Sequence, residues 1–141
     1  NALDYQLLFS EQQALYCAAS HHLFNQPVIS LDDLDRCDHV LHSYRSISIH
    51  QPLQASLSSA RCEQVEGSLA FILSGAHIGY LPEHIAAPWV ANGSLRALLP
   101  EQLGFNVDFH LASHRGRHPG DAQRAFVEDL QCAFGVAHVR C

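Results

Sequence analysis

The chain has 141 residues, of which 48% are hydrophobic and 16% are charged, and its formal net charge is −6. This composition is typical of one folded domain and excludes a disordered chain. All eight basic residues are arginines, scattered from Arg36 to Arg140, so the sequence lacks the basic stripe of a nucleic-acid-binding surface. No uninterrupted apolar run reaches the roughly 18 residues of a membrane span. The chain begins at Asn1 and contains no methionine, so we expect a fragment or a processed chain.

The first part of the chain predicts alternating strands and helices. The apolar run from Ala14 to Ala19 predicts a buried strand over Gln12–Ser20. Ser30 and Asp33 have nearly the spacing and chemistry of a capping box, which predicts a short helix beginning at Leu31. Further strands are predicted at Asp38–His42 and Arg61–Val65, with a helix from Pro52 to about Ala60 between them.

The stretch Gly67–Pro82 contains the motif around which the chain is organised. It begins with an apolar helical run, which Gly75 ends because glycine takes the left-handed conformation at little cost. A short strand follows at His77–Leu81, and Pro82 opens the next helix, where a missing N–H group costs nothing. Helix, turn, strand and helix in this order are typical of a crossover unit in a doubly wound α/β sheet.

The C-terminal part predicts two helices and two strands. A helix at Glu83–Ala91 contains Pro88, which is expected to kink or divide it, and Leu95–Leu99 predicts a strand. Apolar and polar residues alternate over Phe105–Ala112, which predicts a half-buried strand. The element order as a whole predicts a mostly parallel sheet. The last predicted helix runs from Pro119 to Phe134, and its expected buried face is Ala122, Phe126, Leu130 and Ala133.

Three motifs resemble the effector-binding domains of LysR-type transcriptional regulators. They are Glu66, the run Ser74-Gly75-Ala76-His77-Ile78-Gly79-Tyr80-Leu81-Pro82, and the helix end Asn92-Gly93-Ser94-Leu95. The resemblance implies an α/β fold of the type 2 periplasmic-binding-protein kind, in which two lobes are joined by two crossover strands. It implies that residues 1–18 are the end of the first lobe and the outgoing strand. Residues 19–104 would then be the second lobe, and residues 105–141 the return strand and a helix packed on the first lobe.

The same resemblance implies a function. A small-molecule effector would bind between the lobes and modulate DNA binding by an N-terminal winged helix-turn-helix that this chain lacks. Such a protein would be cytoplasmic and homo-oligomeric, a dimer or, when intact, a tetramer. Leu69–Ser74 is a candidate for part of the contact surface, and nearly as readily a segment that serves only the core. The alternative is a lobe of a periplasmic solute-binding protein with the same fold. Free thiols and the absence of an export signal favour the regulator.

Two loops are the predicted effector-binding site, because ligands of open parallel sheets lie beyond the carboxyl ends of the strands. The first contains Ser43, Tyr44 and Arg45, whose hydroxyl and guanidinium groups suit an organic acid, although Arg45 is as readily a solvated loop residue. The second contains Val65, Glu66 and Gly67. Backbone N–H groups at Gly67 and Ser68 suit an anion, whereas Glu66 favours a ligand amine or hydroxyl.

The remaining reactive residues predict neither a metal site nor catalysis. The five cysteines are odd in number and lack CxxC spacing, so we expect reduced thiols, with Cys17 and Cys132 acting as small hydrophobic residues. The eleven histidines show no metal-binding spacing and are interpreted as scattered surface residues. A nucleophile elbow of the G-x-S-x-G kind is absent from the sequence. The sequence therefore predicts no catalytic residue, no metal and no cofactor, and the protein is not expected to be an enzyme.

Overall fold

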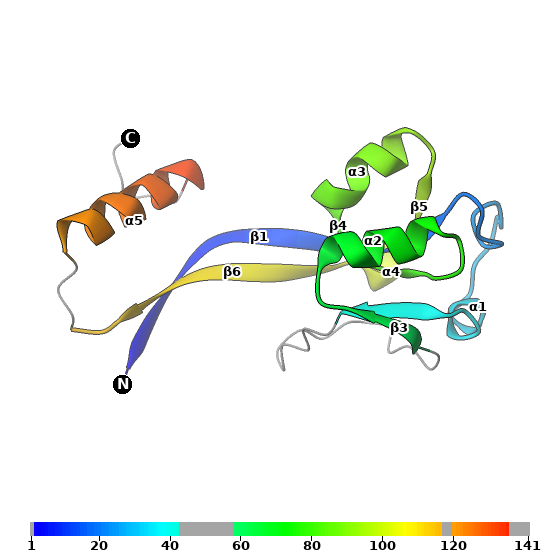
Figure 1. Ribbon diagram of the computed structural model, residues 1–141, viewed down its shortest axis with the longest axis horizontal. Coiled ribbons are helices and arrows are strands. Elements are labelled where there is room, and N and C mark those ends of the chain that lie inside the picture. Colours follow the sequence, from blue (N-terminus) through cyan, green and yellow to red (C-terminus); the bar gives the residue numbers. More distant parts are fainter. Residues whose placement is uncertain (1, 43–57, 117–119, 136–141) are drawn as a thin grey trace. The chain divides into compact units, whose positions relative to one another are not determined.

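The computed structural model describes residues 2–42, 58–116 and 120–135, which belong to two compact units. Unit 1 comprises Asn1–Glu11 and Asp108–Cys141, and unit 2 comprises Gln12–Val107. Two long strands, β1 (Leu3–Ala18) and β6 (Phe105–His114), pair with each other and run through both units (Figure 1). The assignment of these parts to two lobes of a larger domain stays a prediction.

The sheet of unit 2 is built around the second half of β1. This strand pairs antiparallel with β4 (Gly79–Pro82) on one side and with β5 (Leu95–Leu98) on the other. The parallel pairing that the sequence predicts is found in a neighbouring pair of strands, β2 (His39–His42) and β3 (Ser58–Cys62). A parallel bridge from His39 to Ile78 joins this pair to the start of β4. The crossing strand β1 is therefore the strand that runs antiparallel to its neighbours β4 and β5. The strands β2, β3 and β4, which follow one another along the chain, meet in parallel contacts.

Apolar side chains cover both faces of β1 inside unit 2, which explains its nearly unbroken hydrophobic run. Successive strand residues point to opposite faces, so Leu15 and Cys17 enter one core cluster while Ala14 and Tyr16 enter the other. The first cluster is Leu15, Cys17, Leu23, Ile29, Leu34, Cys37, Ile78, Tyr80, Leu98 and Leu103. The second is Ala14, Tyr16, Ala18, Val40, Ala60, Ile72, Leu81, Ala86 and Leu95.

Three described helices of unit 2 begin and end near the predicted positions, whereas a short helix at Pro100–Leu103 was not predicted. The capping box is confirmed: Ser30 accepts a hydrogen bond from the Asp33 N–H, and the Asp33 carboxylate accepts one from the Ser30 N–H. Gly75 has a φ of 81°, which confirms the left-handed helix end. Pro88 was expected to kink or divide its helix; the helix continues as one segment, so the division is wrong and the kink stays a prediction. The helices in the described residues of unit 2 are α1 (Leu31–Asp35), α2 (Val65–Leu73), α3 (Glu83–Ala91) and α4 (Pro100–Leu103).

The boundaries around β3 differ from the prediction. The strand begins at Ser58, three residues before the predicted start, so the helix expected to reach Ala60 is wrong over its last residues. The earlier part of that predicted helix, from Pro52 to residue 57, lies outside the described residues. Ala60 is buried whereas Ser59 and Arg61 are exposed, so the strand alternates in burial. Hydrophobicity alone did not predict this alternation, because most residues of the strand are small or polar.

Unit 1 contains the helix α5 (Asp121–Ala133), the first half of β1 and the second half of β6. Phe9 stacks on Phe109 at 4.7 Å and on Phe134 at 4.6 Å between ring centroids. The described part of α5 has no buried residue, and Phe126 is 62% exposed, so the predicted buried face of Ala122, Phe126, Leu130 and Ala133 is wrong here. Two strands present too little surface to cover a helix face.

Two further expectations concern the cysteines and the membrane. Cys17, Cys37 and Cys62 are free, as predicted, but Cys132 is disulfide-bonded, so the prediction of a reduced thiol is wrong at that residue. Among the described helices, none combines the length and the hydropathy that a membrane span requires.

Candidate functional site

A polar pair, the half-buried His42 and the buried Ser68, lies where the parallel strands of unit 2 end. His42 is the last residue of β2, and Ser68 lies in α2, which follows β3 after a short turn. The Ser68 Oγ is 3.3 Å from the His42 Nε2, and the Ser68 residue is only 1% exposed. Burial lowers the pKa of His42 from its ordinary value, which keeps the ring neutral at neutral pH. The pair is thus an uncharged hydrogen-bonding unit beside the carboxyl ends of β2 and β3.

The predicted residues Val65, Glu66 and Gly67 lie in the first turn of α2 and not in a loop. Val65 is half-buried and packs against the second core cluster, while Glu66 is exposed. Gly67 faces Cys62, and a Cβ at this position would be 3.2 Å from the Cys62 Sγ. Glycine therefore allows the helix to approach the end of β3 closely. Ser43, Tyr44 and Arg45, the other predicted residues, lie outside the described part of the chain.

The N-terminus of α2 provides hydrogen-bond donors at this edge. The first N–H groups of a helix have no partner within it, and the N-cap residue Gln64 gives them no side-chain hydrogen bond. The Ser68 N–H is bonded to the Gln64 carbonyl at 3.3 Å, so the expectation that this amide cradles an anion is wrong. The donors that remain for a ligand are those of Val65, Glu66 and Gly67, together with the partial positive charge of the helix end.

Sequence reasoning missed the side chains of three residues at this edge: His42, Cys62 and Ser68. His42 is the last residue of a correctly placed strand, and ligands gather at that end of a parallel strand. Cys62 ends β3 in the same way. These strand ends were the usable signal for both residues. Ser68 carried no such signal, because its burial depends on how α2 packs against β2.

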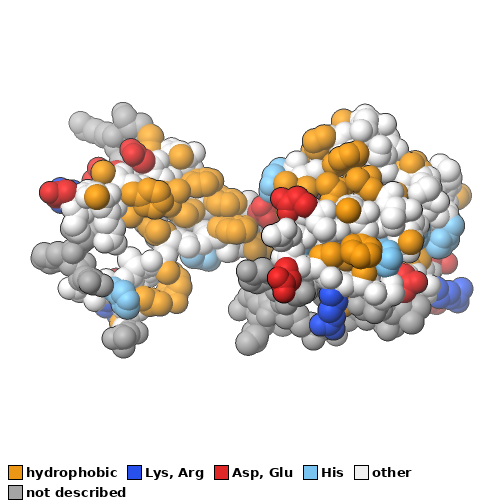
Figure 2. Space-filling view, viewed as in Figure 1, with side chains coloured by type: hydrophobic (Ala, Val, Ile, Leu, Met, Phe, Trp, Pro, Cys, Tyr) orange, Lys and Arg blue, Asp and Glu red, His pale blue; other side chains and the backbone are white. Residues whose placement is uncertain are grey.

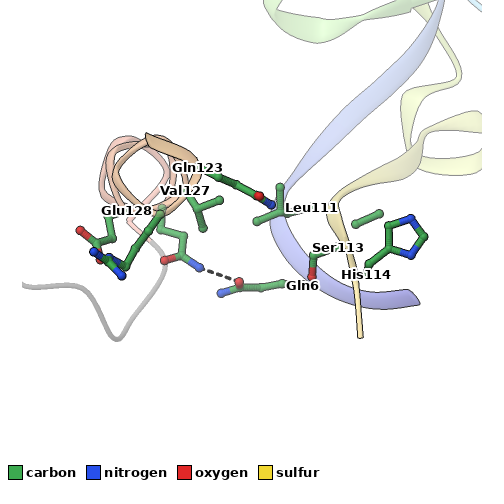
Figure 3. A pocket seen from close by; sticks show the side chains of 10 residues that line it. Gln6, Leu111, Ser113, His114, Gln123, Val127 and Glu128 are labelled. Carbon is green, nitrogen blue, oxygen red and sulfur yellow. Dashed lines mark hydrogen bonds between the residues drawn. The ribbon is translucent and has the colours of Figure 1, made fainter. Parts of the chain in front are cut away.

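A separate hollow of about 440 Å³ lies in unit 1, between α5 and the outer ends of β1 and β6 (Figure 3). Gln6 and Gln131 join the two sides through a hydrogen bond of 2.6 Å. Arg124, a charged residue of the lining, is paired with Asp121 at 2.7 Å. The lining also contains the Glu128 carboxylate and the His114 ring, beside amide, hydroxyl and aliphatic side chains.

The fold and this edge define an α/β ligand-binding domain, and comparison with known proteins identifies its family. A family model described as the LysR substrate binding domain matches residues 1–135. The chain therefore belongs to the LysR substrate-binding domain family, as the sequence motifs predicted. The predicted fold class, an α/β domain like the periplasmic binding proteins, is also confirmed.

Known relatives agree with this assignment. The chain is 37% identical over 131 residues to the HTH-type transcriptional activator BauR of Pseudomonas aeruginosa. The match covers 91% of this chain and 43% of BauR, so the chain spans less than half the length of this relative.

Two solved structures show the same fold at low sequence identity. The CcmR regulatory domain of Synechocystis PCC6803 in complex with 2-PG matches with a TM-score of 0.75 and 15% identity, covering 96% of this chain and 68% of that one. The HypT regulatory domain of Salmonella typhimurium matches with a TM-score of 0.69 and 20% identity, covering 94% and 67%. These relatives are regulators, so the alternative of a periplasmic solute-binding protein gains no support.

Proposed function

We propose that this chain binds the small-molecule effector of a LysR-type transcriptional regulator, at the carboxyl ends of β2 and β3. The observation that carries this proposal is the position of the α2 N-terminus, whose N–H groups lie at the edge where both parallel strands end. Helix dipole, strand ends and a neutral histidine at one edge are what a small polar ligand requires.

An organic acid fits this edge best. Its carboxylate would accept hydrogen bonds from the N–H groups of Val65 and Gly67, where the helix end attracts negative charge. Arg45, in the segment that follows β2, would supply a second contact to the same carboxylate. Glu66 is exposed in the first turn and disfavours a dianion, so an amine or hydroxyl elsewhere in the ligand would face it. We therefore propose a carboxylic acid that also bears an amine or hydroxyl group.

The same geometry supports binding without catalysis. A serine beside a histidine is the pairing of a hydrolase nucleophile and its base. Ser68, however, is 1% exposed, and its hydroxyl is held against His42 beneath the surface of α2. A nucleophile in that position has no access to a substrate. We therefore propose that the pair fixes α2 to β2 and that the protein is not an enzyme.

The regulatory role is proposed for the longer protein. BauR is described as an HTH-type transcriptional activator, and this chain matches 43% of its length. We propose that a helix-turn-helix elsewhere in the same protein binds DNA in the cytoplasm. Effector binding would act by stabilising one arrangement of the domain over another. Phe71 of α2 is 40% exposed, which supports α2 as a contact surface between copies of the protein.

Calorimetric titration with a panel of carboxylic acids and amino acids tests the ligand proposal. A carboxylic acid that also carries an amine or a hydroxyl group should bind. Glu66→Gln should weaken the binding of this ligand more than it weakens the binding of the same acid without the amine or hydroxyl. Glu101→Gln is the matched control, because Glu101 is also an exposed first-turn glutamate, in α4. Equal effects of the two substitutions, or binding that neither changes, would contradict the placement of the site at α2.

A further inference from the structure

Three potential metal ligands gather in unit 2, on elements other than those of the α2 edge. They are His21 and His22, just after β1, and Cys37, just after α1. Their ligand atoms all lie within 4.8 Å of one another. The two imidazole rings have centroids 4.3 Å apart, and the Cys37 Sγ is 3.9 Å from the His22 Nε2. Sequence spacing did not reveal this cluster, because folding alone brings together residues that are 15 positions apart.

The separations are close to those of a tetrahedral metal site. With Zn–S near about 2.3 Å and Zn–N near about 2.0 Å, sulfur and nitrogen ligands are about 3.6 Å apart. The Cys37–His22 separation of 3.9 Å therefore needs an adjustment of only a few tenths of an ångström. No separation in the cluster exceeds 4.8 Å, so the side chains need to move by no more than about 1 Å, well within rotamer freedom.

The backbone that carries these ligands is held in place on both sides. An Arg96 nitrogen donates hydrogen bonds to the carbonyls of Leu23, Phe24 and Gln26 at 3.3, 2.6 and 2.9 Å, which fixes the segment after His22. On the other side, the capping box orders α1, and the Cys37 N–H bonds to the Leu34 carbonyl at 3.1 Å. Ligands that are fixed before binding lose little entropy when a metal arrives.

We propose that His21, His22 and Cys37 form a three-ligand site for a borderline-soft divalent metal ion such as Zn²⁺. Two imidazoles and one thiolate are ligands that zinc prefers, and three protein ligands leave a fourth position for water or a small ligand. His21 and Cys37 are 7% and 3% exposed, which gives the ion a sheltered side, whereas the exposed His22 leaves a path from solvent.

Binding replaces a proton by a metal at the sulfur. Without metal, the Cys37 thiol donates to the Asp33 carbonyl at 3.2 Å, and burial, followed by Asp33 and Asp38, raises its pKa. The metal forms a bond to the sulfur, and the thiol proton leaves to solvent, with no change in oxidation state. The same two carboxylates that disfavour a bare thiolate attract a cation to the site.

The site also predicts a change at one backbone amide. The Leu23 N–H donates to the His21 Nδ1 at 3.2 Å, so the neutral His21 ring carries its proton on Nε2. Coordination at Nδ1 removes this acceptor, and coordination at Nε2 moves the proton onto Nδ1. Either way, metal binding breaks the hydrogen bond of the Leu23 amide.

Titration of the purified protein with Co²⁺, followed by competition with Zn²⁺, tests the proposal. Co²⁺ reports its ligands, because a thiolate gives a sulfur-to-metal charge-transfer band and tetrahedral coordination gives intense visible bands. We expect one equivalent to bind with both features, and Zn²⁺ to displace it. The His22→Ala variant should bind about 100-fold more weakly or worse, since a direct ligand matters at least as much as its supporting partners. The amide resonance of Leu23 should shift on addition of Zn²⁺.

Two control variants make the outcome specific. Cys37→Ser should abolish the charge-transfer band, whereas Cys62→Ser, which removes a free thiol on β3, should retain it. His110→Ala removes an exposed histidine on β6 and should bind as the unchanged protein does. Because His22 is exposed, its variant folds even if the buried Cys37 does not tolerate substitution. Absence of the band, its loss in Cys62→Ser alone, or equal affinity in His22→Ala would overturn the proposal.

Discussion

The Ser68 hydroxyl and the His42 ring join α2 to the end of β2 through a hydrogen bond of 3.3 Å. Ser68→Ala should lower the free energy of unfolding by about 1–3 kcal/mol, because the half-buried His42 nitrogen loses its partner. Urea denaturation measures this loss.

Ser59→Ala is the matched control for Ser68→Ala. Ser59 makes a comparable bond of 2.7 Å to His77, but at an exposed position on β3. Water can replace an exposed partner, so this substitution should cost less. Equal losses in the two variants would mean that burial of the Ser68–His42 pair contributes nothing.

The folded protein should lose stability as the pH decreases through the range where histidine titrates. Burial is the largest cause that lowers the pKa of His39 below its ordinary 6.5, outweighing the hydrogen bond to Leu34 and the nearby Asp35 and Asp38. The unfolded chain then binds the proton more readily than the folded one. The stability from neutral His39 is therefore complete above pH 6.5 and is lost as the pH falls toward the lowered value. His21 and His42 act in the same direction.

Thermal melts between pH 7.5 and 5 provide the measurement for His39. His39→Gln keeps a donor for the Leu34 carbonyl, which His39 Nε2 contacts at 3.0 Å, but it cannot become charged. This variant should lose less stability than the original protein over the interval. Identical slopes in His39→Gln and in the original protein would disprove the assignment.

Local backbone signals made much of the fold predictable. The Ser30–Asp33 capping box and Gly75 each determine the backbone conformation of only the few residues around them, and the sequence located both correctly. The errors arose where long-range packing decides the structure. Ser58–Cys62 is a strand because it pairs with β2, which its own small polar residues do not reveal. The amphipathic pattern of α5 predicted a buried face, but burial depends on what surrounds the helix.

The candidate site was less predictable than the fold, for a related reason. The strand end at His42 is a local feature and could have been chosen from sequence. Ser68 became significant only when α2 packed against β2, and His21, His22 and Cys37 became a cluster only through the loop that Arg96 holds. Such groupings depend on contacts between distant parts of the chain, so spacing along the sequence does not display them.

Two glycines with nearly the same φ separate backbone strain from crowding. Gly75 and Gly93 have φ angles of 81° and 79°, so alanine at either position costs about 1–2 kcal/mol of conformational strain. A Cβ at Gly93 meets no atom within 4 Å, whereas one at Gly75 collides with the Ser20 side chain. Gly75→Ala should therefore destabilise the protein more than Gly93→Ala does, as measured by chemical denaturation.

The double variant Gly75→Ala with Ser20→Ala identifies the cause of that difference. Removing the Ser20 hydroxyl relieves the closest contact but leaves its Cβ at 3.1 Å. Part of the excess loss should therefore return, and the strain common to both glycines should remain. If the double variant is no more stable than Gly75→Ala alone, crowding against Ser20 is not the cause.

Unit 1 should make the purified chain self-associate. Hydrophobic side chains gather over its strands and helix (Figure 2), and large apolar residues are exposed there. These are Leu3, Tyr5, Leu7, Phe109, Phe126 and Phe134, with exposed fractions from 39% to 67%. A contiguous apolar surface of this kind binds other apolar surfaces. Light scattering after size exclusion should show a mass that rises with concentration.

Phe126→Ser should reduce this association, because Phe126 is 62% exposed on α5 and its ring gains apolar contacts when chains meet. Val28→Ser is the matched control: Val28 is 79% exposed but belongs to unit 2, so the association should persist. A monomer at every concentration would show that the unit 1 surface is not adhesive. Equal reduction by both variants would show that exposed apolar area in general, and not the unit 1 surface, drives the contact.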